Sequence, residues 1–532
     1  MSAKSVLKEV FGYDSFRKGQ EQLVNAVNEG KDVCGVMPTG AGKSICFQVP
    51  ALMFEGITLV ISPLISLMRD QVSALNAAGV HAAYFNSSLT PGQYAKALGI
   101  ARTGLYKLIY VAPERLDTER FLDFALDPNV KISFVAVDEA HCVSQWGQDF
   151  RPSYLKIADF VKKFKERPVV GAYTATATAA VKEDIIKLLE LEEPVSVTTG
   201  FDRDNLYFSV KKPRDKYAAL KFYLQDKEEA MPGASGIVYC LTRKNVDQVA
   251  DRLEKDGFSV TRYHAGLDEQ VRHANQENFI SGNKQIMVAT NAFGMGIDKS
   301  DVRYVVHYNM PKDMESYYQE AGRAGRDGDM AECVLLYGKG DVRLNNFLIE
   351  HSNEANEELD EEEKDVIEQR DKERLKKMTF YCHTKYCLRS YILNYFGEKG
   401  PKNCGNCSVC LNESQAVEEP LYIPENVDAP YEAGYSSAGI RKTYVSGRKR
   451  SAAESLEEGD KRIFESLRAL RTKIAKESRL HPYIIFSDRT LAYMAVERPR
   501  TKEEMLKISG VGQYKYEKYG ERFLKVLNEA YY

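Results

Sequence analysis

The sequence lacks the features that would place it in a membrane or in the secretory pathway. No stretch approaches the roughly 18 consecutive apolar residues that a membrane helix needs. Its first residues, MSAKSVLKEVF, lack the apolar core of a signal peptide, so we expect a cytoplasmic protein, associated with the nucleoid if bacterial. Excess charge is also missing, because 73 Lys and Arg residues nearly balance 76 Asp and Glu residues. Any binding of nucleic acid must therefore come from local grooves.

Tryptophan and cysteine are scarce over most of the chain. The only tryptophan is Trp146, and five of the ten cysteines lie between residues 382 and 410. In a cytoplasmic chain these cysteines are not expected to form disulfides, so their density needs another chemical reason. Apolar residues at 44% and charged residues at 28% are ordinary globular usage, which excludes a disordered or collagen-like chain.

The order of apolar patterns predicts several domains in a chain of 532 residues. Residues 1–200 and residues 201–345 each alternate β-branched runs, such as ITLVIS and QIMVATNA, with helical patterns, which predicts two tandem α/β units with parallel sheets. A ligand cleft is expected between them. Residues 346–412 hold a charged stretch, interpreted as a solvated connecting helix, and then the cysteines. Residues 413–457 are typical of an extended linker, and residues 458–532 predict a small all-α domain.

A glycine-rich segment, MPTGAGKS at residues 37–44, follows an apolar run and precedes a helical pattern. Such a turn lets backbone N–H groups and a helix N-terminus approach phosphate oxygens. Lys43 is expected to reach the β- and γ-phosphates and Ser44 to bind Mg²⁺. The strict pattern has glycine where this chain has Met37. We expect ATP to be bound by Thr39, Gly40, Gly42, Lys43 and Ser44.

Two further segments complete a nucleotide-hydrolysing set. VDEAH places Asp138 and Glu139 at the end of an apolar strand, where Asp138 can hold Mg²⁺ and Glu139 can polarise the attacking water. In the second unit, YYQEAGRAGRDG offers Gln319, Arg323 and Arg326, which can neutralise transition-state charge across a cleft. Each segment alone would also suit a solvated surface turn. Together with the phosphate loop they predict catalysis.

The cysteine cluster has the spacing of a metal site. Cys404, Cys407 and Cys410 form Cys-x2-Cys-x2-Cys, and Cys387 lies upstream across a helical stretch. Four thiolates fit a closed tetrahedral zinc site. The same four would also suit a [4Fe–4S] cluster, so the residues alone leave both open.

At this point the motifs resemble a known family. FRKGQ (16–20), the phosphate loop, SPLISLMRDQV, VAPERL, VDEAH, YTATAT, ATNAFGMGID and QEAGRAGRDG occur in the order found in superfamily-two helicases. The segment HCVSQWGQDFRPSY (141–154) and the cysteines narrow the resemblance to RecQ DNA helicases, over about residues 8–412. The resemblance implies two RecA-like lobes and an enzyme that uses ATP and Mg²⁺ to unwind DNA in the 3′-to-5′ direction. It also implies single-stranded and forked DNA as substrates, roles in recombination, repair and the SOS response, and single-strand-binding protein and repair nucleases as partners. The sequence does not determine the oligomeric state, for which we expect a monomer.

The resemblance assigns further residues. Arg17 and Gln20 would contact the adenine, and Arg326 would be the arginine finger. Trp146, Phe150 and Arg151 lie in a segment that resembles the family's aromatic-rich loop, where an aromatic face stacks on an unpaired base for about 1–3 kcal/mol. The family pattern also implies zinc, held by Cys387, Cys404, Cys407 and Cys410, with Cys382 and His383 outside the ligand set.

The C-terminal part resembles the HRDC module of helicases and RNase D. In LKISGVGQYKYEKYG, Gly510 and Gly512 precede a helix that mixes lysine and tyrosine, which suits either DNA or protein contacts. Many relatives carry a winged-helix domain before this module. Only about 50 residues separate Cys410 from Lys461, the lower limit for a domain, so we predict no complete winged helix. Two alternatives stay open: an RNA helicase of the same superfamily, and a DNA-binding scaffold with a non-productive motor.

Overall fold

The computed structural model describes most of the chain, and some of the predictions fall outside it. The described residues are 2–145, 147, 149–294, 299–354, 361–411, 456, 458–478 and 480–529. Trp146 lies outside the described residues, as does nearly all of the predicted linker at 413–457. Among the described helices, none has both the length and the apolar character needed to cross a membrane.

Lobe 1 is built on a seven-stranded parallel sheet with the strand order β3-β4-β2-β5-β6-β1-β7. Its strands are β1 (Val33–Val36), β2 (Ile57–Ile61), β3 (Ala82–Phe85), β4 (Leu108–Val111), β5 (Ile132–Val137), β6 (Val169–Thr174) and β7 (Val195–Thr198). The connecting helices are α1 (Ala3–Phe11), α2 (Gln20–Asn28), α3 (Ile45–Met53), α4 (Ile65–Ala77), α5 (Pro91–Arg102), η1 (Pro113–Arg115), α6 (Glu119–Ala125), η2 (Ala140–Val143), α7 (Pro152–Lys162) and α8 (Ala179–Leu188). Every residue of β2 is buried, as expected for a strand covered by helices on both faces.

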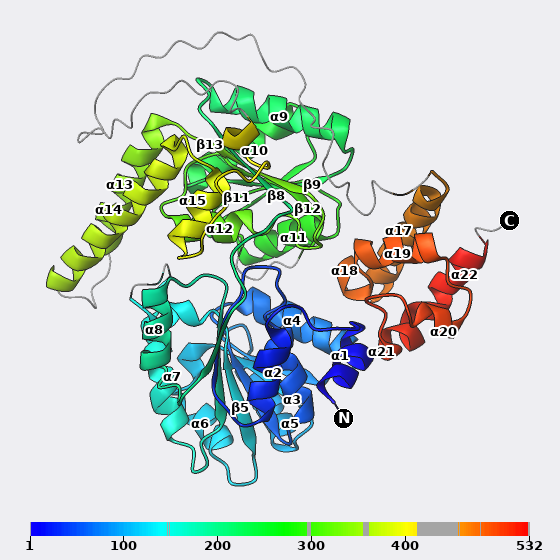
Figure 1. The fold of residues 1–532 in the computed structure, drawn as a ribbon. Coiled ribbons are helices and arrows are strands. Elements are labelled where there is room, and N and C mark those ends of the chain that lie inside the picture. Colours follow the sequence, from blue (N-terminus) through cyan, green and yellow to red (C-terminus); the bar gives the residue numbers. More distant parts are fainter. Residues whose placement is uncertain are drawn as a thin grey trace.

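Lobe 2 repeats this architecture with six parallel strands in the order β10-β11-β9-β12-β13-β8, and it lies above lobe 1 in Figure 1. Its strands are β8 (Leu206–Lys211), β9 (Ser235–Tyr239), β10 (Val260–Tyr263), β11 (Ile286–Ala289), β12 (Val302–His307) and β13 (Ala331–Leu336). Its helices are α9 (Lys216–Ala230), α10 (Arg243–Lys255), α11 (Glu269–Ile280) and α12 (Met314–Ala321). The prediction of two tandem parallel α/β lobes is confirmed.

A helical region follows lobe 2 and packs on it. Its helices are α13 (Lys339–Glu354), α14 (Glu361–His383), α15 (Leu388–Tyr395) and α16 (Ser408–Leu411), and the long pair α13 and α14 lie side by side in Figure 1. The rings of Phe201 and Phe396 stack at 4.5 Å, and the hydroxyls of Tyr317 and Tyr381 lie 3.1 Å apart. These contacts join the region to lobe 2 as one packed body.

The C-terminal domain is all-α and has its own core, as predicted. It comprises α17 (Glu458–Ser478), α18 (Pro482–Ile485), α19 (Asp488–Glu497), α20 (Lys502–Met505), α21 (Gln513–Lys515), the π-helical turn η4 (Tyr516–Gly520) and α22 (Glu521–Glu529). The helical spacing of Ile463, Leu467, Leu470 and Ile474 predicts one apolar face. Along α17 the first, second and fourth of these residues are buried and Leu470 is partly buried.

This C-terminal domain contacts both lobes. The Gly510 N–H donates to the Gly12 carbonyl at the end of α1, with an N···O distance of 2.9 Å. His481 Nε2 lies 3.7 Å from Asp70 on lobe 1 and 3.4 Å from Glu277 on lobe 2. Burial opposes the charged imidazole, but these two carboxylates outweigh burial and raise the pKa of His481. The domain therefore bridges the lobes.

The close approach of two glycine backbones at this interface gives a testable prediction. A Cβ atom on Gly12 would lie 2.8 Å from backbone atoms of Gly510, Val511 and Gly512. We expect Gly12→Ala to displace the C-terminal domain and raise the radius of gyration in small-angle X-ray scattering. Gly30→Ala is the matched control, because Gly30 also has a positive φ (+78°) but no neighbour within 4 Å of an added Cβ. Both variants share the left-handed backbone cost of about 1–2 kcal/mol. Identical scattering of the two variants would contradict the prediction.

Candidate nucleotide and zinc sites

The nucleotide site lies where three neighbouring strands of lobe 1 end. β6 pairs with β1 on one side and with β5 on the other, all in parallel register. Their carboxyl ends therefore bring together the phosphate loop after β1, the Asp138–Glu139 pair after β5 and the Thr174–Thr176 segment at the end of β6. Ligands of open parallel sheets bind at this edge.

The phosphate loop has the backbone shape that phosphate binding needs. As predicted, it connects strand β1 to helix α3, which begins at Ile45. Gly40 and Gly42 have φ values of +85° and +83°, which favour glycine because other residues are strained there. Lys43 follows directly, and its Nζ lies 3.4 Å from Glu139 Oε1.

Asp138 and Glu139 occupy different electrostatic environments although they are adjacent. Burial, together with the charge of Glu139, raises the pKa of Asp138 to about 7. Burial acts in the same direction on Glu139, but the positive charges of Lys43 and His141 outweigh it and lower the pKa of Glu139. Glu139 also has a φ of +48°, a strained backbone for a non-glycine residue, and such strain is concentrated at functional sites.

Residues of lobe 2 reach this edge. Gln319 Nε2 donates to Thr176 Oγ1 across the lobe junction at 2.9 Å. A Cβ atom on Gly40 would lie 3.5 Å from Arg326 Cγ, so the structure places Arg326 beside the phosphate loop. Arg323 is buried and donates to the Gly294 carbonyl within lobe 2. Of the three residues predicted from lobe 2, Gln319 is hydrogen-bonded to lobe 1 and Arg326 lies beside its phosphate loop.

Arg203 is a junction residue that the sequence analysis missed. Its guanidinium donates to the Thr39 carbonyl at 2.8 Å and to the carbonyls of Gly322, Ala324 and Gly325 at 2.8–3.3 Å. It therefore ties the phosphate loop to the turn that carries Arg326. All of these partners are backbone carbonyls, so no side-chain motif marks the residue in the sequence.

Arg17 and Gln20 also lie against the phosphate loop. Gln20 Nε2 donates to the carbonyls of Ala41 and Gly42, both at 3.0 Å, and Gln20 Oε1 accepts from the Arg17 N–H at 2.8 Å. The Arg17 guanidinium donates to the Gly40 carbonyl. These side chains hold the loop in shape, and their expected contact with adenine stays a prediction.

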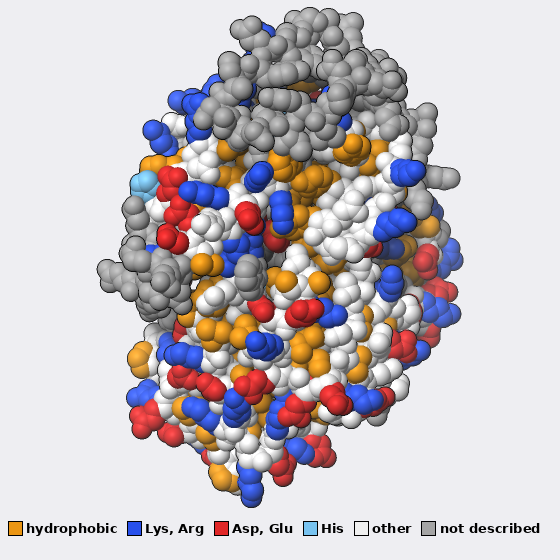
Figure 2. Space-filling view, turned by 60° about the vertical axis from the view of Figure 1, so that its left-hand side comes forward, with side chains coloured by type: hydrophobic (Ala, Val, Ile, Leu, Met, Phe, Trp, Pro, Cys, Tyr) orange, Lys and Arg blue, Asp and Glu red, His pale blue; other side chains and the backbone are white. Residues whose placement is uncertain are grey.

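The segment predicted to form the aromatic-rich loop, residues 141–154, begins within η2 and ends in the first turn of α7. Phe150 is half-buried, and Arg151 donates to the Pro63 carbonyl at 3.2 Å and pairs with Asp149 at 3.1 Å. Over the lower half of the face in Figure 2, Lys and Arg side chains are interspersed with Asp and Glu and form no continuous basic surface. The DNA contacts of Trp146, Phe150 and Arg151 stay a prediction.

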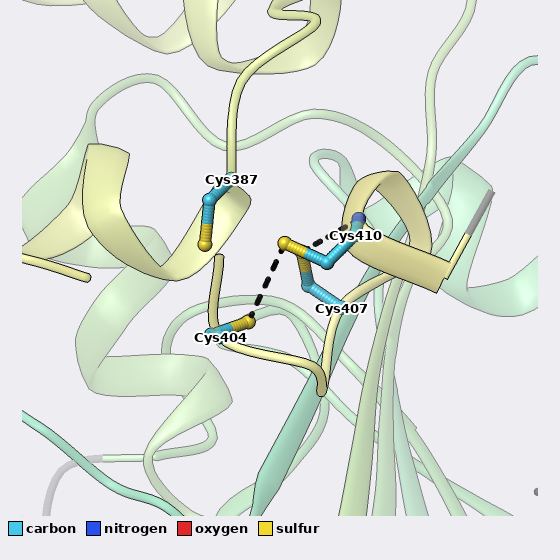
Figure 3. A group of neighbouring side chains, drawn as sticks. All are labelled: Cys387, Cys404, Cys407 and Cys410. Carbon is cyan, nitrogen blue, oxygen red and sulfur yellow. Dashed lines mark hydrogen bonds between the residues drawn. The ribbon is translucent and has the colours of Figure 1, made fainter. Parts of the chain in front are cut away.

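The four predicted metal ligands converge (Figure 3). The Sγ atoms of Cys387, Cys404, Cys407 and Cys410 all lie within 4.8 Å of one another, and the Cys404–Cys410 pair is 3.9 Å apart. Zn–S bonds of about 2.3 Å in a tetrahedron require sulfurs about 3.8 Å apart, so the cluster fits zinc. Cys382 lies outside this group, and His383 instead lies 3.0 Å from Lys212 Nζ. The predicted ligand set is confirmed.

Two RecA-like lobes that meet over a phosphate loop define an ATP-driven helicase motor. Family models match four segments in order: DEAD/DEAH box helicase at 17–185, helicase conserved C-terminal domain at 215–328, RecQ zinc-binding at 339–411 and HRDC domain at 460–527. The ATP-dependent DNA helicase RecQ of Bacillus subtilis is 40% identical, covering 99% of this chain and 98% of that protein. The chain therefore belongs to the RecQ family of ATP-dependent DNA helicases.

Two further similarities agree with this assignment. The ATP-dependent DNA helicase RecQ of Haemophilus influenzae is 36% identical, covering 99% of this chain and 96% of that protein. A solved structure of the DEAD-box helicase Mss116 bound to ssRNA and UDP-BeF is 16% identical, with a TM-score of 0.54. That match covers 70% of this chain and 83% of the other, and it shows the shared fold alone.

Proposed function

We propose that this chain translocates 3′-to-5′ on single-stranded DNA and separates duplex DNA, with each step driven by ATP hydrolysis at the lobe junction. One observation carries the proposal: Lys43 of the phosphate loop pairs with Glu139 in lobe 1, and Arg326 of lobe 2 lies beside the same loop at Gly40. Hydrolysis that needs both lobes couples the chemical step to their relative movement.

The residues at the lobe junction have separable roles. Lys43, paired with Glu139 in this structure, would turn to the β- and γ-phosphates and leave Glu139 to orient the attacking water. Arg326 would neutralise the charge that develops on the transferred phosphoryl group. Asp138 and the Ser44 hydroxyl are the oxygen donors that would hold Mg²⁺, which neutralises phosphate charge when bound. A bound cation would favour the ionised form of Asp138, whose pKa burial and Glu139 raise.

Trp146 provides a test of how DNA controls hydrolysis. We expect Trp146→Ala to leave ATP binding intact but to raise the single-stranded DNA concentration for half-maximal ATPase by roughly 5- to 150-fold, the equivalent of one lost base stack. A steady-state ATPase titration with oligonucleotide measures this concentration. Unchanged stimulation would remove the loop from the mechanism.

The choice of nucleic acid and the direction of movement are tested on matched substrates. We expect single-stranded DNA to stimulate the ATPase more than RNA of the same sequence, and duplexes with a 3′ tail to be unwound in preference to those with a 5′ tail. Stronger stimulation by RNA would favour the RNA helicase alternative. ATP binding without strand-dependent turnover would favour the scaffold.

The predicted lack of a complete winged helix bears on the substrates. The Bacillus subtilis relative aligns over 601 residues, whereas this chain has 532, so that relative has residues within the aligned region that this chain lacks. Residues 413–455 lie outside the described residues, so the lack of a complete winged helix stays a prediction. We therefore expect weak unwinding of blunt duplexes and better unwinding of forks, in a cytoplasmic role in repair with single-strand-binding protein and repair nucleases as partners.

A further inference from the structure

The long helix α14 crosses from the zinc-binding region to the segment that follows η2 in lobe 1. The Arg370 guanidinium donates to the Gln145 carbonyl, and Arg374 Nη1 donates to the Gly147 carbonyl at 3.3 Å. These arginines are 15% and 11% exposed. Because they are four residues apart on a helix, the two arginines lie on one face. We call their hydrogen bonds to the carbonyls of Gln145 and Gly147 the grip on lobe 1.

Two lysines of α14 differ from these arginines in making no described contact with lobe 1. Lys372 is 45% exposed and pairs with Glu368 one turn away on the same helix. Arg370 and Arg374, in contrast, lie 3.8 and 3.5 Å from Asp371 on their own helix and also reach lobe 1. Lys376 is also exposed. The helix therefore has a solvated face, as predicted for the charged stretch, and a second face on which two arginines are withdrawn from water by contact with lobe 1. On that second face the interpretation as a solvated connecting helix is wrong.

Gly147 packs against η2, the turn that directly follows Glu139. A Cβ atom on Gly147 would lie 2.3 Å from the His141 carbonyl oxygen and 3.0 Å from that of Ser144, so the backbone at 147 rests directly on η2. His141 Nδ1 in turn lies 2.8 Å from Thr174 Oγ1 and 3.4 Å from Glu139 Oε2. The contacts therefore run from the Arg374 guanidinium through Gly147 and His141 to Glu139, the residue proposed to orient water.

We propose that Arg370 and Arg374 are positioning residues for Gln145 and Gly147, the two described residues that flank Trp146 in the sequence. They hold the carbonyls of Gln145 and Gly147 in place before DNA arrives, so that less conformational freedom is lost when DNA binds beside them. Because α14 belongs to the body formed with lobe 2, the pair also links the DNA-sensing segment of lobe 1 to the lobe that carries Arg326. The proposal rests on the proposed function, in which this segment senses DNA.

The matched comparison is Arg370→Ala/Arg374→Ala against Lys372→Ala/Lys376→Ala. Both double variants remove two positive charges four residues apart on α14, but only the first removes the grip on lobe 1. Trp146 is the only tryptophan among 32 tyrosines, so fluorescence excited at the red edge of the absorption, where tyrosine does not absorb, reports on this position alone. Without DNA, we expect the arginine variant to show lower Trp146 anisotropy and stronger quenching by acrylamide than the lysine variant. Equal values for the two variants would overturn the proposal.

The ATPase titration separates positioning from direct DNA contact. We expect the arginine variant to need roughly tenfold more single-stranded DNA for half-maximal stimulation, with kcat at saturating DNA and the salt dependence both as in the lysine variant. A salt slope lower by about one per arginine would instead assign them to phosphate contacts and overturn the proposal. If the double variant fails to fold, judged by zinc content and thermal unfolding, Arg370→Ala alone is tested by the same fluorescence measurement.

These outcomes also separate this proposal from the proposed function. If the wild-type chain shows no DNA-stimulated ATPase, the proposed function fails, while the fluorescence comparison still tests the grip. If the wild-type ATPase is stimulated but the arginine and lysine variants behave alike, only the positioning role fails.

Discussion

Replacing Arg326 with alanine is expected to lower DNA-stimulated ATP turnover by about 10³- to 10⁵-fold, the range found for arginine fingers. The side chain lies beside Gly40 of the phosphate loop, yet it comes from the other lobe. Its loss therefore removes charge stabilisation in the transition state and leaves the lobe 1 contacts to ATP in place. Binding of a fluorescent ATP analogue should be nearly unchanged, whereas coupled-assay turnover should be lost.

Two further variants serve as comparisons for Arg326→Ala. Arg343→Ala removes an exposed arginine of α13 and should leave turnover at the wild-type level. Lys43→Ala should abolish hydrolysis and unwinding but also weaken nucleotide binding, because Lys43 belongs to the phosphate loop itself. DNA affinity should persist in all three. Turnover by Arg326→Ala above a tenth of the wild-type rate would show that the two lobes do not share the chemistry.

Replacing Cys407 with serine is expected to cost folding and zinc, with little effect on the chemistry of the protein that does fold. Cys407 is fully buried, and its backbone is bridged to Phe208 of strand β8, so the metal site also supports the edge of the lobe 2 sheet. Free energy of zinc binding, about 10–16 kcal/mol in small structural sites, is folding energy. We expect substoichiometric zinc and a large drop in the thermal unfolding temperature.

Cys382→Ser is the matched control, because Cys382 is equally buried but lies outside the four-cysteine group. Its zinc content, measured by elemental analysis, should remain one ion per chain. A brown protein that carries iron and sulfide would contradict the zinc assignment.

The sequence was sufficient for features that local pattern determines. The phosphate loop and the Asp138–Glu139 pair each follow an apolar run, and together they predicted one nucleotide-hydrolysing site. The spacing of the cysteines and the family pattern predicted the four zinc ligands. Arg203, Arg370 and Arg374 escaped prediction because their contacts with distant parts of the chain are to backbone carbonyls, whereas their side-chain partners Asn205 and Asp371 are local. Carbonyl acceptors are present at every residue and leave no sequence pattern.

The burial of particular charged residues is the second feature that the sequence does not predict. A run rich in glutamate and lysine predicts a solvated helix correctly on average, but which of its arginines contact another lobe depends on tertiary packing. Gln20 illustrates the same point, since its amide holds the backbone of the phosphate loop, a contact that no spacing rule specifies.

The contact between the C-terminal domain and the two lobes carries a mechanical consequence. Arg489 donates to the carbonyl of Asp327, one position after Arg326, while the Gly510 amide is bonded to Gly12 on the opposite lobe. If the two lobes move apart after each hydrolysis event, at least one of these two hydrogen bonds must break. The described contact consists of a few hydrogen bonds and ion pairs, among them those of Arg489, Gly510 and His481, which can break and re-form, so this domain would be loosened and re-seated with every nucleotide consumed.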